Sequence, residues 1–356
     1  MKIITIVGAR PQFVKAAVVS RALRQAPDKV DELLVHTGQH YDDNMSRVFF
    51  EELGVPKPSY NLGIGGGSHG QNTGRMLEAI ETVLLKERPD WVLVYGDTDS
   101  TLAGTLASVK LHIPVAHVEA GLRSFNRAMP EELNRVLTDH ASSLLFTPTA
   151  VATSNLNREG IETTHIRQVG DVMFDAALFY SKLAEDGSKI LSQLGVKKGE
   201  YALATLHRAE NTDSRERLAG ILEGLAQSPL PVVLPLHPRT AKRLGEYSLE
   251  LPKTVLKIDP IGYLDMMKLE KNASLIATDS GGIQKEAYFH QVPCITLRDE
   301  TEWKELVEIG ANRIVGADPD VIGDSLKHGC SFPDEAGQLY GDGTAAQKIA
   351  KELLTT

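Results

Sequence analysis

The sequence has only two cysteines, the residues that build disulfide frameworks and many zinc sites. Its two cysteines, Cys294 and Cys330, lie far apart and form no CxxC pattern, so neither a zinc site nor a disulfide framework is indicated. No apolar run reaches the roughly 18 residues that a membrane-spanning helix needs. The chain starts directly with the apolar run KIITIVG and shows no cleavage site, so we expect a cytoplasmic protein that does not bind membranes.

Acidic residues outnumber basic ones, with 47 aspartates and glutamates against 38 lysines and arginines. The formal net charge is −9 at pH 7, which argues against a surface for nucleic acid or for anionic membranes. An anionic small molecule can still bind wherever a few cations gather. The 356 residues, 42% hydrophobic and 24% charged, are typical of a globular protein and too many for one comfortable core, so we expect two domains.

Apolar, strand-like runs alternate with longer amphipathic segments along the chain. The first series contains KIITIVG, DELLVHTG, DWVLVYGD, PVAHVEAG and SSLLFTPT, and the second begins near residue 200 with YALATLHR, PVVLPLHP, TVLKIDP and SLIATDSGG. This βαβα order predicts parallel sheets with helices on both faces. We therefore expect two doubly wound α/β halves that meet near residues 166–179 and face each other across a cleft.

Ionisable residues and glycines gather where these runs end. They are Arg10, Lys15, Asp97, Glu119, Arg123, Glu131 and Arg135 in the first half, and His207, Arg208, His237, Ser280, Gly281 and Gly282 in the second. Ligands of open parallel sheets bind beyond the carboxyl ends of the strands. One charged strand end is usually a solvated loop, but this number of them predicts a shared active cleft.

The stretch TDSGGIQKEA illustrates the pattern. An apolar run stops at Ser280, Gly281 and Gly282 and then continues directly as a helix-like segment. The first amides of a helix have no partner in the chain, and together with the positive end of the helix dipole they suit a phosphate. The alternative is an ordinary strand-to-helix loop in which Ser280 caps the helix.

Several of these residues also have purely structural interpretations. Asp97 could cap the helix STLAGTLASVK, and Glu131 could be a first-turn acid that balances a helix dipole. Arg123 and Arg135 could form surface ion pairs of little energetic weight. His117 lies within an apolar run, which favours a hydrogen-bonded core histidine over a ligand.

Two apparent cofactor motifs do not fit their usual context. The segment GGGSHG contains GxGxxG, but no hydrophobic strand precedes it, so we predict a mobile loop and no nicotinamide site. The pair Asp97 and Asp99 resembles a metal-binding DxD motif, although a helix cap explains the same residues. We therefore predict neither a metal nor a cofactor.

Eight segments together resemble a known family. GARPQFVK, VYGDTDST, HVEAGLRS, MPEELNR, LHRAEN, LHPRT, TDSGGIQKEA and YGDG occur with the order and spacing of the non-hydrolysing UDP-N-acetylglucosamine 2-epimerases, over nearly the whole chain. The resemblance implies two facing Rossmann-like domains in the GT-B arrangement, an active-site cleft between them, and a homodimeric isomerase. It implies an N-terminal domain of residues 1–168 joined by a C-terminal helix, 343–356, and a UDP-binding domain of residues 169–342.

The resemblance also implies roles for individual residues. The catalytic positions are Asp97, Glu119, Glu131 and His207, and the nucleotide-sugar cleft contains Arg10 and Lys15. The residues that hold UDP are His237, Ser280, Gly281, Gly282 and Glu286, with the diphosphate at the serine and glycines and the ribose hydroxyls at Glu286. We expect Arg123, Arg135 and Arg208 to bind the UDP-sugar as well.

Two segments depart from the usual family pattern. GARPQ stands where the family often has GTRPE, and TEWKE, residues 301–305, stands where it often has TERPE. These variants resemble a branch that acts on UDP-2,3-diacetamido-2,3-dideoxyglucuronate, a precursor for surface polysaccharide. The substituents on carbons 3 and 6 of the sugar stay open, and activation by a second UDP-N-acetylglucosamine is not carried over to this chain.

Epimerisation at carbon 2 of an amino sugar restricts the mechanism. The hydrogen on this carbon is barely acidic, so either a nicotinamide oxidises the sugar or UDP leaves first. Without a nicotinamide site we expect elimination and re-addition of UDP, with carboxylates moving the proton and cations supporting the diphosphate. The alternatives are a GT-B glycosyltransferase, a hydrolysing 2-epimerase and a non-catalytic UDP-sugar sensor.

Overall fold

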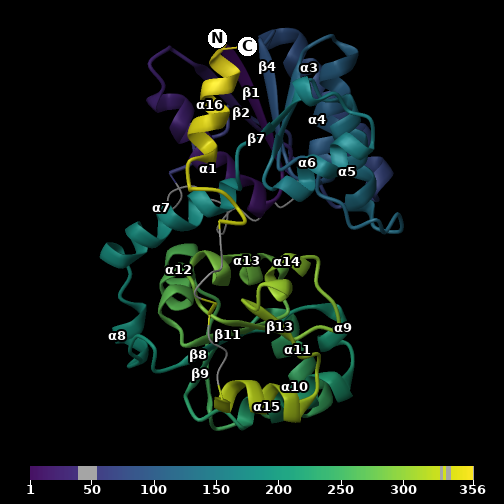
Figure 1. Cartoon of the computed structure of the whole chain (residues 1–356). Helices are drawn as coiled ribbons and strands as arrows, with labels where there is room; N and C mark the ends of the chain where they lie inside the picture. The colour runs from purple at the N-terminus through teal and green to yellow at the C-terminus, as the bar shows by residue number, and fades with distance from the viewer. Residues whose placement is uncertain (39–53, 329–331, 334–337, 356) are drawn as a thin grey trace. The chain divides into compact units, whose positions relative to one another are not determined.

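The computed structural model describes residues 1–38, 54–328, 332–333 and 338–355 (Figure 1). Cys330 lies outside these residues. The chain divides into two compact units: unit 1 contains Met1–Ala176 and Gln338–Thr356, and unit 2 contains Ala177–Gly337. Each unit is built on one parallel sheet, which confirms the predicted fold class of two parallel-sheet α/β domains. The domain boundaries predicted from the sequence, 168/169 and 342/343, remain predictions.

Unit 1 has a seven-stranded parallel sheet with the order β3-β2-β1-β4-β5-β6-β7. Its strands are β1 Lys2–Val7, β2 Asp31–His36, β3 Tyr60–Asn61, β4 Trp91–Tyr95, β5 Val115–Val118, β6 Leu144–Thr147 and β7 Ile166–Gln168. Helices cover the sheet, so β4, β5 and β6 are buried along their whole length. This explains their continuous apolar runs, which lack the alternation of a half-exposed strand.

The helices of unit 1 follow the strands in the predicted alternation. They are α1 Arg10–Gln25, α3 His69–Glu87, α4 Asp99–Lys110, α5 Pro130–Ala141, α6 Ala150–Arg158, the 3₁₀ turn η1 Thr163–His165, and α16 Ala345–Thr355. The C-terminal helix α16 lies beside α1 (Figure 1). The glycine-rich segment GGGSHG leads into α3, whose N-cap is Ser68.

Unit 2 has a six-stranded parallel sheet with the order β10-β9-β8-β11-β12-β13. Its strands are β8 Ala202–Thr205, β9 Val232–Pro235, β10 Val255–Ile258, β11 Leu275–Thr278, β12 Cys294–Thr296 and β13 Asn312–Ile314. Its helices are α8 Ile190–Leu194, α9 Ala209–Thr212, α10 Arg215–Ala226, α11 Pro238–Tyr247, α12 Tyr263–Asn272, α13 Gly281–Phe289, α14 Lys304–Glu308 and α15 Pro319–His328.

Helix α7, Val172–Gly187, begins in unit 1 and continues into unit 2. Its first turn is tied to the start of α16, because Asp175 accepts hydrogen bonds from the amides of Ala345 and Ala346 at 3.1 and 2.7 Å. The amide of Asp171 also donates to the carbonyl of Tyr340 at 2.9 Å. These bonds explain why the first turn of α7 belongs to unit 1.

Each sheet has one topological switch point. This is a pair of neighbouring strands from which the connecting segments run toward opposite edges of the sheet. In unit 1 it lies between β1 and β4, and in unit 2 between β8 and β11. Ligands of doubly wound sheets bind beyond the strand ends at such points. The predicted site residues follow these same strands.

No helix in the described part of the chain is long and apolar enough to cross a membrane. Within the same residues, no group of three or more histidine, cysteine, aspartate or glutamate side chains could hold a metal ion.

Candidate active site

Gln12 joins the two loops at the switch point of unit 1. Its Oε1 accepts hydrogen bonds from the amides of Gly8 and Ala9 at 2.8 and 2.9 Å. Its Nε2 donates to the carbonyl of Tyr95 at 2.8 Å and to Thr98 Oγ1 at 3.0 Å. The side chain must therefore accept at one end and donate at the other, which an amide does and a carboxylate does not. The glutamine of GARPQ thus fixes the loop that carries Arg10, the first residue of α1, against the loop of Asp97.

Asp97 follows β4 and does not cap α4. The cap is Thr98, whose hydroxyl accepts from the amide of Thr101. The Asp97 carboxylate instead pairs with Arg135 of α5. Asn134 donates to the backbone carbonyl of Asp97 at 3.0 Å. The structural alternative for Asp97 is therefore wrong, and its carboxylate is held by a cation at the strand end.

Lys15 and Glu119 form a second ion pair in unit 1, and each side chain is about one-tenth exposed. Glu119 follows β5 with a φ of 72°, which is strained for a residue with a side chain. A Cβ atom on Gly96 would meet Glu119 Oε2 at 3.4 Å and Lys15 Nζ at 3.5 Å. The strand end that carries Asp97 therefore packs directly against this pair.

Glu131 lies in the first turn of α5, one residue after Pro130, as predicted. Its side chain is exposed and has no hydrogen-bond or ion-pair partner among the described residues. Since residues four apart share a helix face, Glu131 lies on the face of Arg135, which binds Asp97. Unit 1 thus gathers Lys15, Asp97, Glu119, Glu131 and Arg135.

Arg123 is placed differently from the other predicted binding residues. Its side chain is buried, with Nη1 donating to Asp139 at 2.7 Å and Nε and Nη2 both donating to Glu159 at 2.7 Å. These contacts occupy both ends of the guanidinium. They favour a structural role for Arg123. The ion pairs are buried, unlike the surface pair of the alternative interpretation. Substrate binding by Arg123 stays a prediction, and this geometry does not support it.

In unit 2, Asp279 organises the loop after β8. This fully buried carboxylate accepts from the amides of His207 at 3.0 Å and Arg208 at 2.9 Å, and it lies 3.2 Å from His207 Nδ1. Burial lowers the pKa of His207 more than Asp279 raises it, with His237 and Arg208 adding to the lowering. A neutral imidazole therefore results at neutral pH. The role of Asp279 was not predicted, since nothing in TDSGG distinguishes a buried acceptor from a loop residue.

Two more predicted residues lie beside His207. The rings of His207 and His237 have centroids 5.5 Å apart. His237 caps α11, because its Nδ1 accepts from the amide of Arg239 at 3.2 Å. Arg208 is exposed and has no side-chain partner among the described residues, so its guanidinium is available to an anion.

Ser280 stands at the N-cap of α13, yet its side chain makes no capping hydrogen bond. The alternative in which Ser280 is an ordinary cap is therefore wrong. A Cβ atom on Gly281 would lie 2.6 Å from Glu302 Oε1, so the Glu302 side chain leaves no room for a larger residue at this position. Trp303 Nε1 donates to the carbonyl of Gly281 at 2.8 Å. The start of α13 thus presents Ser280, Gly281 and Gly282 as an anion-binding corner.

Glu286 lies four residues after Gly282 on α13, hence on the same helix face. Burial raises its pKa to about 7, while Lys285 and a hydrogen bond from Tyr263 oppose the shift. The Tyr263 hydroxyl is 3.5 Å from Glu286 Oε1. A carboxylate held this loosely can accept hydrogen bonds from a ligand.

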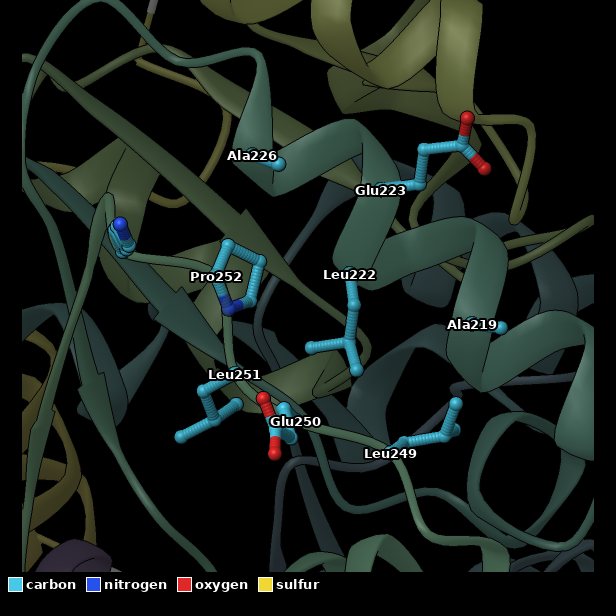
Figure 2. A pocket seen from close by; sticks show the side chains of 9 residues that line it. Ala219, Leu222, Glu223, Ala226, Leu249, Glu250, Leu251 and Pro252 are labelled. Atoms are coloured by element: carbon cyan, nitrogen blue, oxygen red, sulfur yellow. The ribbon is translucent and has the colours of Figure 1, made fainter.

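A groove elsewhere in unit 2 contains none of the predicted site residues (Figure 2). It has a volume of about 400 Å³ and is lined by Ala219, Leu222, Glu223, Ala226, Leu249, Glu250, Leu251, Pro252 and Lys253. The lining is mainly aliphatic and has a single cation, so it does not suit a diphosphate.

Comparisons with known proteins identify the family. The model of the UDP-N-acetylglucosamine 2-epimerase family matches residues 21–354. The UDP-2,3-diacetamido-2,3-dideoxy-D-glucuronate 2-epimerase of Pseudomonas aeruginosa is 55% identical over 360 residues, covering 99% of both chains. The UDP-N-acetylglucosamine 2-epimerase of Methanocaldococcus jannaschii is 48% identical over 363 residues, also covering 99% of both chains.

A solved structure agrees with these relatives. The crystal structure of the Methanocaldococcus jannaschii UDP-N-acetylglucosamine 2-epimerase in complex with UDP-N-acetylglucosamine and UDP matches with a TM-score of 0.86 and 47% identity, covering 100% of both chains. The predicted family is confirmed. The chain therefore belongs to the UDP-N-acetylglucosamine 2-epimerase family and is an epimerase.

Proposed function

We propose that the protein inverts carbon 2 of a UDP-N-acetylated hexosamine without hydrolysing it and without a cofactor. The observation that carries this proposal is the pair of cation-bound carboxylates at the sheet edge of unit 1, Asp97 with Arg135 and Glu119 with Lys15. Proton transfer at carbon 2 needs a positioned acid or base, and carboxylates can serve as either. In unit 2 the uncapped start of α13 supplies the anion site that a departing diphosphate needs.

The reaction proceeds by elimination and re-addition. The bond from carbon 1 to the diphosphate oxygen breaks, and UDP takes the electron pair. A carboxylate removes the proton from carbon 2, which leaves a 2-acetamidoglucal-type intermediate and UDP. A proton is then added to the other face of carbon 2 while UDP rejoins carbon 1. In this proposal Asp97, Glu119 and Glu131 handle the proton, and His207, Arg208 and α13 stabilise UDP.

For the substrate we propose UDP-2,3-diacetamido-2,3-dideoxyglucuronate, which would be converted to its manno epimer for surface polysaccharide. The Pseudomonas aeruginosa relative with this named substrate is 55% identical. The TEWKE variant supports the same choice, since Trp303 contacts Gly281 beside the proposed diphosphate corner. Comparing rates with this sugar and with UDP-N-acetylglucosamine tests the proposal, and a faster reaction of the latter would contradict it.

The function itself is tested by incubating the purified protein with each UDP-sugar in deuterated water. An epimerase incorporates deuterium at carbon 2 and keeps UDP attached to the sugar. Free UDP with free sugar would instead indicate a hydrolysing enzyme. Turnover only after an acceptor is added would indicate a glycosyltransferase, and binding without any exchange would indicate a sensor. Each of these three results would overturn the proposal.

The affinity for UDP is expected to rise as the pH is raised from about 6 to about 8. The pKa of Glu286 is about 7, and above it the charged carboxylate accepts from both ribose hydroxyls, whereas the protonated form must itself donate. In the free protein the raised pKa of Glu286 stabilises the folded state at low pH, and this stabilisation is lost as the pH rises through about 7. Calorimetric titration with UDP across this range measures the effect. Glu286→Gln should flatten the profile, and an unchanged slope in the variant would contradict the assignment.

We also propose that the protein is a homodimer and that α5 takes part in the interface. This helix buries four polar residues, Glu132, Asn134, Thr138 and Asp139. It exposes Leu133 and Leu137, which are 41% and 52% accessible and follow Met129 at a spacing of four. An apolar stripe on the exposed face of a helix marks a surface that binds another protein. In a two-fold dimer the same stripe can cover itself.

Changing Leu133 and Leu137 together to glutamate is expected to convert the dimer to a monomer, because two charges from each protomer would have to be buried at the interface. Light scattering coupled to size-exclusion chromatography measures the mass. The matched control is Leu85→Glu, which alters an exposed leucine on α3 and should leave the dimer intact. A monomeric wild-type protein, or a double variant that stays dimeric, would refute the interface.

A further inference from the structure

A buried ion network behind the strand ends of unit 1 has no part in the proposed chemistry. His117 on β5 is fully buried, and its Nδ1 lies 2.7 Å from Asp139 Oδ1. The other oxygen of Asp139 accepts from Arg123 Nη1 at 2.7 Å. Arg123 continues the network to Glu159. Buried charges are costly unless each is paired, and here each one has a partner.

The inner end of the network reaches the backbone at Asp97. His117 Nε2 lies 2.7 Å from the carbonyl oxygen of Gly96. That oxygen belongs to the peptide bond joining Gly96 to Asp97, so the hydrogen bond fixes the plane from which the Asp97 side chain extends. Gly96 has a φ of 62°, a turn that the β4 strand alone would not hold.

A second branch of the same network reaches the backbone beyond Glu119. The amide of Gly121 donates to Asp139 Oδ2 at 3.1 Å. Glu119 has a φ of 72°, which is strained for a residue with a side chain, so this strand end needs support from its surroundings. One carboxylate, Asp139, therefore restrains the strand ends of both Asp97 and Glu119.

The neighbours of His117 determine which of its ring nitrogens donates a hydrogen bond. Burial alone would raise the pKa of Asp139, but the hydrogen bonds and charges of His117 and Arg123 outweigh it and leave this pKa lowered. Asp139 is thus a charged acceptor, and the carbonyl of Gly96 can only accept. Nε2 of His117 must therefore carry hydrogen and donate to the carbonyl of Gly96.

We propose that His117, supported by Asp139, is a positioning residue that holds Asp97 and Glu119 in register for proton transfer at carbon 2. This role rests on the proposed function, in which those two carboxylates move the proton. His117 never touches the sugar. It acts on the turnover rate and leaves the binding of UDP unchanged.

Two conservative substitutions separate this role from simple core packing. The amide of His117→Asn takes the place of Nδ1 and keeps the bond to Asp139, but it loses Gly96. The amide of His117→Gln takes the place of Nε2 and keeps Gly96, but it loses the bond to Asp139. Since small displacements of a catalytic group cost about 10²-fold, we expect kcat to fall by about 10²-fold in the asparagine variant and by less than about 10-fold in the glutamine variant. KM should stay within about 3-fold of wild type in both.

Glu159→Gln is the control, because it alters the outer end of the network and leaves the bond to Gly96 in place. Its kcat should match the wild type. Equal kcat values for the asparagine and glutamine variants, or a change confined to KM, would overturn the proposal. A wild-type protein without deuterium exchange at carbon 2 would refute the proposed function first, and this role with it.

A measurement on the unaltered protein gives an independent test should the variants fail to fold. Nitrogen-15 spectra of the histidine side chains should contain one ring whose Nε2 carries a hydrogen that exchanges slowly with solvent. His117 has this environment, since it is fully buried between two acceptors. If no solvent-protected ring carries hydrogen on Nε2, the bond to Gly96 is absent and the proposal fails.

Discussion

Asp97→Asn and Glu131→Gln are each expected to lower the rate of hydrogen exchange at carbon 2 by about 10³-fold, because each removes a group that carries the proton. The fold should be unaffected. In the first variant Arg135 keeps Glu132 as a partner, 3.0 Å away. In the second no contact is lost, since Glu131 has no partner among the described residues. The measurement is deuterium incorporation into the UDP-sugar, followed by mass spectrometry.

The matched control for both variants is Glu162→Gln, which neutralises another exposed acid of unit 1 and should retain full activity. UDP affinity should also be retained by both variants, because in the proposal the residues of unit 2 hold UDP. This separates a catalytic defect from a binding defect. If Asp97→Asn and Glu131→Gln exchange deuterium at the wild-type rate, the carboxylates have been assigned the wrong role.

The sequence predicted where chemistry gathers better than it predicted what each side chain contacts. Strand ends are visible as apolar runs that stop, and the order of strands then places Asp97 and Glu119 at one sheet edge. Helix starts are less certain, because a cap depends on one or two backbone angles. This is why Asp97 could be taken for the cap of α4, whereas Thr98 holds that position.

Ion pairs between residues that lie far apart in the sequence could not be predicted, for a different reason. Lys15 and Glu119 meet only because α1 and β5 are brought together by the sheet. An arginine such as Arg123 can bind a phosphate as well as a carboxylate, and only the fold shows that Arg123 binds the buried carboxylate of Asp139. Residue types therefore predicted the chemistry of the site, and the tertiary structure decided which charges balance one another.

Asp279→Asn is expected to weaken UDP binding by about 10- to 100-fold, a loss of about 1–3 kcal/mol. The buried carboxylate accepts from the amides of His207 and Arg208 and from Asn211 Nδ2. An asparagine of the same shape would turn its own amide hydrogens toward these donors. The loop that carries His207 and Arg208 would then shift away from the anion corner at Ser280, and the diphosphate would lose both partners.

The control for this variant is Asp259→Asn, because Asp259 also follows a strand of the same sheet but is exposed, so its replacement should leave UDP binding unchanged. Calorimetry with UDP measures the affinity, and thermal melting shows whether the variant is folded at the titration temperature. Wild-type affinity in a folded Asp279→Asn protein would mean that the loop after β8 keeps its shape without this carboxylate. In that case the uncapped start of α13 would have to bind the diphosphate without help from His207 and Arg208.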